Sequence, residues 1–163
     1  MKTTYSFRSV LRPGPNRKLL KQLMQDAARL AGLPVEKDWE FRIWFLDDEA
    51  MAQAHVEIMD VPGTTDVITM AYLEEPEALF PGDMGLELLI CAPFALREGN
   101  ERADSSYSDE MVLYLVHGCL HAAGENDLVE EDRKEMRRRE AEVLTELRKT
   151  YNFAEVFPPV AAE

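Results

Sequence analysis

The chain has 163 residues, of which 46% are hydrophobic and 30% charged, and its formal net charge is −13. This length fits one domain over residues 1–163, the composition excludes a disordered chain, and the negative charge argues against attraction of nucleic acid through the overall field. The start, MKTTYSFRSVLRPGPNRK, has no apolar signal region, and no later window of about 18 residues is continuously apolar, so we expect a cytoplasmic protein without a membrane span.

The first half of the chain predicts a helix, a strand and a second helix. Apolar residues recur at helical spacing over 17–32, which ends in a glycine. The segment WEFRIWFL (39–46) alternates bulky apolar and polar side chains, as a strand does, and DDEAMAQAHVEIM (47–59) is typical of a short helix with a capping aspartate. Two adjacent strands are then expected from TTDVITMAY (64–72) and LELLICA (86–92).

The second half predicts a buried helix and an amphipathic helix. Ser108 is the expected N-cap of a helix over 109–124 that is apolar on nearly all sides. A terminal helix is expected over 133–151, and residues 152–163 are interpreted as a loosely held tail. The fold class is therefore α+β, with one mixed sheet of about four strands and about five helices.

Two further features have ordinary structural interpretations. Cys91 and Cys119 lie in apolar segments and form no CxxC pair, which indicates reduced core thiols. The dense basic runs are RPGPNRK and RKEMRRR, and the second alternates with acids on a helical pattern, which favours a solvated helix face.

The stretch HGCLHAAGEND (117–127) carries the chemistry. His117 and His121 are four residues apart, so on a helix they project from one face, about 40° apart, and are able to bind one ion. This spacing alone is also compatible with two hydrogen-bonded histidines, but two imidazoles on an apolar helix need partners, and a shared cation supplies them.

A third ligand is expected after Gly124, which lets the chain leave the helix and turn back. Glu125, Asn126 and Asp127 are the alternatives; Asn126 is a poor zinc ligand and Glu125 has little room to return, which favours Asp127. Two imidazoles, one carboxylate and an open position are typical of a catalytic zinc site. Gly118 stands where HExxH metalloproteases carry their glutamate, so Asp66 and Glu87 become the candidate proton acceptors.

Several ordered motifs resemble the YbeY family of metal-dependent bacterial endoribonucleases over roughly residues 40–147. The family motif H-G-x-L-H-L-x-G-x-D-H is similar to HGCLHAAGEND, with its third histidine at Asp127. TTDVITM resembles P-T-D-V-L-S-F, LELLIC resembles G-D-I-x-I-C with Glu87 at the usual aspartate, and MRRREAEVL resembles M-R-x-x-E-x-x-I-L.

The resemblance implies an endoribonuclease that holds one zinc ion, with iron or manganese as less favoured metals. It further implies a role in ribosomal RNA maturation and ribosome quality control, with ribosomal RNA, the small ribosomal subunit and ribosome-associated proteins as partners, and neither DNA nor membrane. His55 is expected in the cleft or on the surface and outside the metal ligands. Met59 stands where the family has an arginine near its RNA-binding cleft.

Two alternatives remain open on the sequence alone. Met59 and the acidic composition favour a metal-stabilised binding module that docks on ribosomal or GTPase partners with weak or no catalysis. A metal-dependent hydrolase of another substrate is the third interpretation.

Overall fold

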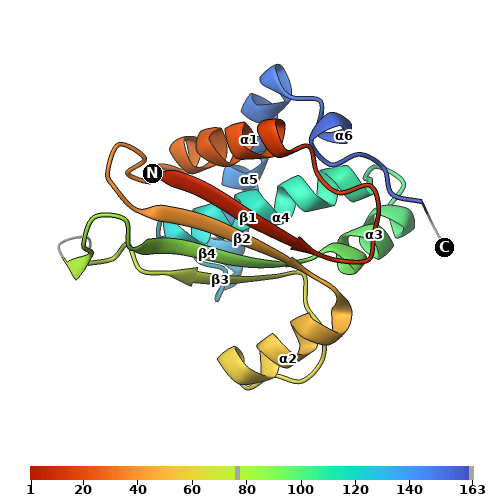
Figure 1. Ribbon diagram of the computed structural model, residues 1–163, viewed down its shortest axis with the longest axis horizontal. Coiled ribbons are helices and arrows are strands. Elements are labelled where there is room, and N and C mark those ends of the chain that lie inside the picture. The colour runs from red at the N-terminus through yellow and green to blue at the C-terminus, as the bar shows by residue number, and fades with distance from the viewer. Residues whose placement is uncertain (76–77, 162–163) are drawn as a thin grey trace.

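The computed structural model describes residues 1–75 and 78–161, which form one four-stranded mixed sheet with helices on both faces (Figure 1). The strand order is β1-β2-β4-β3. β1 (Lys2–Arg8), β2 (Glu40–Leu46) and β4 (Met84–Cys91) are parallel, whereas β3 (Val67–Ala71) runs antiparallel to β4 at the edge. The predicted α+β class with a mixed sheet is confirmed, as is the adjacency of the last two strands.

Six helices lie in the described residues. α1 and α4 contact one face of the sheet and α5 packs on both of them, while α2 stands on the other face (Figure 1). Their bounds are α1 (Arg17–Ala31), α2 (Asp48–Met59), α3 (Ala92–Glu101), α4 (Tyr107–Ala122), α5 (Glu130–Thr150) and α6 (Phe153–Val156). No helix within 1–75 and 78–161 is both long and apolar enough to cross a bilayer.

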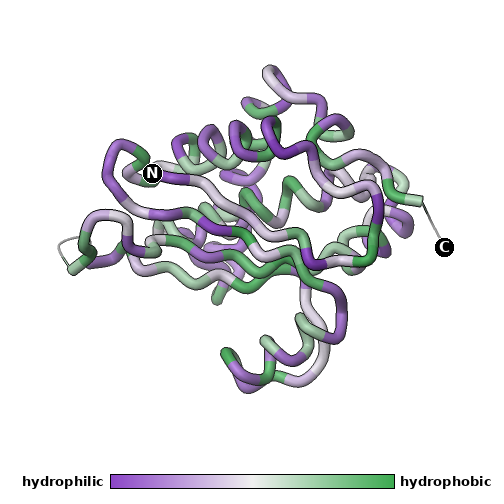
Figure 2. The backbone as a smooth tube through the Cα atoms, in the orientation of Figure 1, coloured by the Kyte–Doolittle hydropathy of each residue, from purple (hydrophilic) through white to green (hydrophobic). Residues whose placement is uncertain are grey.

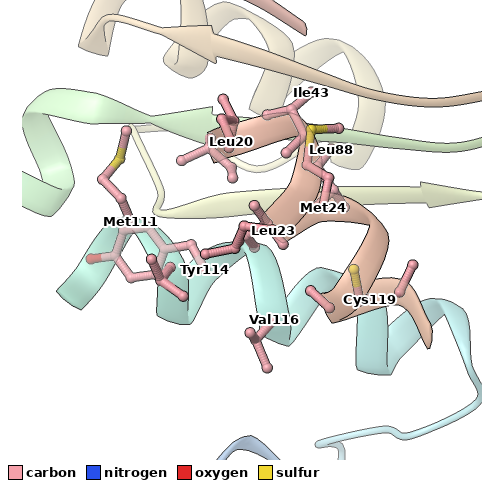
Figure 3. Packing of buried hydrophobic residues seen from close by; sticks show 14 of the residues in the cluster. Leu20, Leu23, Met24, Ile43, Leu88, Met111, Tyr114, Val116 and Cys119 are labelled. Carbon is pink, nitrogen blue, oxygen red and sulfur yellow. The ribbon is translucent and has the colours of Figure 1, made fainter. Parts of the chain in front are cut away.

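The core lies between the sheet and α4, which is hydrophobic along most of its length (Figure 2). Leu23 and Met24 of α1 meet β2, β4 and α4 there (Figure 3), and Cys119 is a buried free thiol, as Cys91 is on the opposite face. Alternate strand residues facing these helices are fully buried: Phe41, Ile43, Phe45, Leu86, Leu88 and Ile90.

Gly118 allows α4 to approach the sheet closely. A Cβ atom at this position would overlap the side chain of Leu88, which is fully buried on β4. The missing side chain between the two histidines therefore lets α4 pack closely against Leu88 of the sheet.

Two predictions were wrong: the N-cap residue of α4 and the loose packing of the tail. The N-cap of α4 is Ser106, which accepts the N–H of Asp109, whereas Ser108 is buried inside the helix and donates to the carbonyl of Phe157. That contact also shows that the tail is not loose, because Phe153 and Phe157 are buried in the core cluster. The last two residues, 162–163, lie outside the described residues.

Three elements were not predicted. β1 has the sequence KTTYSFR, in which Tyr5 and Phe7 pack against the core and alternate with polar residues; this short strand pattern is not assigned from the sequence. α3 begins at the chain turn after β4, and α6 is a single turn whose cap is Asn152. Such short elements depend on tertiary packing more than on local periodicity.

Candidate metal centre

The two histidines of α4 face the same side, as their spacing predicts. The His117 and His121 ring centroids are 4.6 Å apart with the planes at 82°. About a quarter of each side chain is exposed, 25% for His117 and 26% for His121. The imidazoles therefore sit at the rim of the core, reachable from solvent yet held by a buried helix.

Asp127 reaches this pair because the chain reverses at Gly124. Gly124 adopts φ 104°, in the left-handed region, and the N–H of Glu125 donates to the carbonyl of Leu120. Asp127 follows two residues after Glu125, and Arg133 Nη1 of α5 donates to its carbonyl at 3.4 Å, which ties the loop to α5. The glycine turn expected from the sequence is confirmed, and it returns Asp127 to the histidine face.

The spacing of the donor atoms fits a single transition-metal ion. Asp127 Oδ2 lies 3.4 Å from His121 Nε2 and 3.7 Å from His117 Nε2, and one ligand atom from each residue lies within 4.8 Å of the others. Ligands about 2.1 Å from a tetrahedral zinc ion stand about 3.4 Å from one another. A small shift of the Asp127 carboxylate would complete three ligands and leave a fourth position open.

Glu140 of α5 orients one of these ligands. Its Oε2 accepts a hydrogen bond from His117 Nδ1 at 2.6 Å, so Nδ1 carries the proton and Nε2 is left as the donor atom for a metal. Burial lowers the pKa of His117, but the hydrogen bond and charge of Glu140 outweigh it and hold this pKa above its ordinary value. Glu140 is the first of the two glutamates in MRRREAEVL, and its role is not predicted from the sequence.

A cleft of about 540 Å³ opens at this centre, between the edge strand β3 and the histidines. Asp66, a predicted proton acceptor, lies in it at the start of β3, where Oδ1 accepts the N–H of Val67 at 2.7 Å. Within the described residues, the cleft lining contains no lysine or arginine: Met59, Asp66, Val67, Ile68, Thr69, Ala71, His117, His121 and Asp127.

Glu87 is not brought to the cleft, which corrects its expected position. On β4 the side chains of Leu86 and Leu88 point to the helices, so Glu87 between them leaves the sheet on the opposite face. There it accepts the indole N–H of Trp44 at 3.1 Å. Of the two predicted proton acceptors, the structure places only Asp66 beside the histidines.

His55 and Met59, which precede β3 in the sequence, differ in their position relative to the cleft. His55 of α2 pairs through Nδ1 with the carbonyl of Gly63 at 2.8 Å and does not belong to the group of candidate ligands. Met59, at the end of α2, lines the cleft and is 54% exposed. The side chain at the position of the family arginine therefore does face the site, but it is uncharged.

Comparisons with known proteins show which family this chain resembles. A family model described as Endoribonuclease YbeY matches residues 11–148. A protein of that name from Chlamydia abortus is 36% identical over 111 residues, covering 67% of this chain and 70% of the relative, and one from Micrococcus luteus is 36% identical over 110 residues, covering 65% and 69%. The solution structure of a Thermotoga maritima protein matches with a TM-score of 0.54 and 17% identity over 90% of this chain and 92% of that one, a likeness that concerns the fold.

Proposed function

The chain belongs to the endoribonuclease YbeY family, and from this membership we propose that it is a metal-dependent endoribonuclease, a hydrolase of RNA phosphodiester bonds, with His117, His121 and Asp127 as the metal ligands. The observation that carries the proposal is the convergence of three ligand atoms within 4.8 Å on one open cleft. Zinc is the proposed metal, because two imidazoles, one carboxylate and an open position are typical of catalytic zinc sites. Iron and manganese remain less favoured alternatives, since the same ligands also suit these ions.

A divalent ion held by His117, His121 and Asp127 would supply a Lewis acid for a phosphate oxygen and would lower the pKa of bound water. The chain itself contributes orientation and proton transfer. Glu140 fixes the His117 ring, and Asp66 is the proposed proton acceptor, because it lines the cleft and its Oδ1 is held by the Val67 N–H. Because Asp127 is negatively charged, it would lower the net charge of a loaded centre below that of a site with three histidines, and bound water would then be less acidic.

The biological setting is part of the same proposal. We place the activity in the cytoplasm, in ribosomal RNA maturation and ribosome quality control, with single-stranded segments of ribosomal RNA as substrate and the small ribosomal subunit and its associated proteins as partners. We propose neither DNA nor a membrane as a partner. Its support is the family membership and the metal centre, whose open cleft suits a flexible strand better than a rigid duplex.

One observation favours a second candidate, a metal-stabilised module that binds ribosomal partners without cleavage. The cleft presents Met59 where the family carries an arginine, and its described lining offers no cationic side chain to phosphate. A hydrolase of another substrate would share this cleft and is the third candidate.

Digestion of structured ribosomal RNA discriminates between the candidates. Zinc-loaded wild type is compared with His121→Ala and Asp127→Ala, with zinc content measured for each. Cleavage by wild type and its loss in both variants supports the endoribonuclease. Absence of cleavage by wild type, despite one bound zinc ion, favours the binding module. Equal cleavage by all three proteins would indicate a contaminating nuclease and leave the binding module as the favoured candidate.

A further inference from the structure

The basic run at the start of α5 divides into two groups in the structure. Lys134, Arg138 and Arg139 pair with glutamates of the same helix, as expected of a solvated face. Arg133 and Arg137 have no carboxylate partner within 1–75 and 78–161, and both are exposed. Intrahelical ion pairing therefore explains three of the five cations and leaves two without such a role.

These two arginines share one face of α5 with the residue that orients the metal centre. Arg133, Arg137 and Glu140 are spaced i, i+4 and i+7, which places them on one stripe of the helix. Both ends of the stripe touch candidate ligands: Arg133 donates to the carbonyl of Asp127, and Glu140 accepts from His117. Arg137 lies between them, roughly 6 Å along the axis from Arg133.

The cleft is rich in negative charge, which makes the nearby arginines of α5 important for binding a polyanion. Asp66, Asp127 and Glu140 carry three carboxylates around the centre, which exceeds the charge of one divalent ion. A polyanion approaching the cleft would meet no attraction from its lining, because the lining has no lysine or arginine among the described residues. The exposed guanidinium groups on the α5 side are positioned to supply that attraction.

We propose that Arg133 and Arg137 bind backbone phosphates of single-stranded RNA beside the metal centre, taking over on α5 the role of the cation absent at Met59. This inference rests on the proposed function. Guanidinium groups suit phosphate because their planar donors match its oxygens. Two cations on an otherwise acidic protein match the lower charge density of a single strand better than that of a duplex.

The test uses zinc-loaded full-length protein and a fluorescein-labelled oligouridylate of about ten nucleotides, a length within the usual range of single-strand sites. Binding anisotropy is measured over a series of KCl concentrations. Arg137→Gln is the main variant because Arg133 also holds the Asp127 loop. Arg138→Gln is the matched control, since it removes the same charge from the paired group of the same helix. Zinc content is determined for every protein.

Arg137→Gln is expected to raise the Kd for RNA roughly tenfold, the usual effect of losing a charged hydrogen bond. The slope of log K against log salt concentration should become shallower by about 0.7, the value for one phosphate contact on a single strand. Zinc content should not change. Arg137→Lys should keep the salt slope, and Arg138→Gln should bind as wild type does.

The outcomes separate this inference from the function on which it rests. If wild type binds and cleaves RNA while Arg137→Gln matches Arg138→Gln in affinity and salt slope, the assignment of the arginines is wrong and the endoribonuclease stands. If wild type neither binds nor cleaves the strand, both proposals are overturned.

Discussion

Replacing Glu140 with glutamine tests how strongly α5 supports the metal centre. The substitution keeps the size of the side chain and an oxygen able to accept from His117 Nδ1, but it removes the negative charge. That charge is well placed, because Oε2 lies 2.6 Å from Nδ1 and the Glu140 side chain is only 14% exposed. Solvent therefore screens the interaction less than it would on the surface.

The expected loss follows from the role of such partners. A carboxylate that accepts from a metal-binding histidine raises the basicity of its other nitrogen, and its loss typically costs 10–100-fold in metal affinity. We expect the zinc Kd of Glu140→Gln to rise within this range, equivalent to about 1.4–2.7 kcal/mol. Because the side chain of His117 remains in place, one zinc ion per chain should still bind at saturation.

Competition with a chromogenic zinc chelator at neutral pH measures the effect. Glu142→Gln is the matched control, since Glu142 lies on the same helix but pairs with Arg138 and Arg139 and contacts no histidine. It should retain wild-type zinc affinity. Equal zinc affinity in Glu140→Gln and wild type, or equal losses in both variants, would refute the assigned role of Glu140.

Three further predictions follow from packing, charge and protonation. Gly118→Ala should lower the free energy of unfolding by about 1–2 kcal/mol in urea titrations, because overlap with Leu88 costs more than the roughly 1 kcal/mol gained in helix propensity. Unchanged stability would contradict the close approach of α4. Met59→Arg should tighten binding of single-stranded RNA and steepen its salt slope by about 0.7, and an unchanged slope would remove Met59 from the RNA path. The pKa of His117 is raised above its ordinary value of 6.5, so its pairing with Glu140 should stabilise the metal-free protein below pH 6.5 and lose this contribution as pH rises through the higher pKa of the folded state; metal-free stability that rises with pH over this range would contradict the pairing. Over the same range, falling pH should weaken zinc binding, because protons compete with the ion.

The parts of the site that could be predicted from the sequence are those fixed by local geometry. Helical periodicity alone places His117 and His121 on one face, and a glycine in the left-handed conformation is enough to return Asp127 toward them. Asp66 was reached through its acidic character next to a strand, and the fold does bring it to the cleft.

The parts that could not be predicted depend on how distant elements pack. Glu140 meets His117 only because α5 lies along α4, and nothing in the spacing of 23 residues encodes that contact. Glu87 was placed at the site although LELLIC is nearly continuous in apolar residues and so does not reveal which face each side chain takes. The burial of Phe157 is not predicted from the sequence, because it depends on core residues from distant segments of the chain.

Zinc content of four purified proteins tests the central claim most directly: wild type, Glu125→Ala, Asp127→Ala and Asp127→His, each equilibrated with zinc and freed of excess metal before elemental analysis. We expect one zinc ion per chain in wild type, no change in Glu125→Ala, severe loss in Asp127→Ala and retention in Asp127→His, because Asp127 is the carboxylate that approaches both imidazoles among the residues the structure describes. Loss of zinc in Glu125→Ala with full occupancy in Asp127→Ala, or a wild type that takes up no zinc, would contradict it.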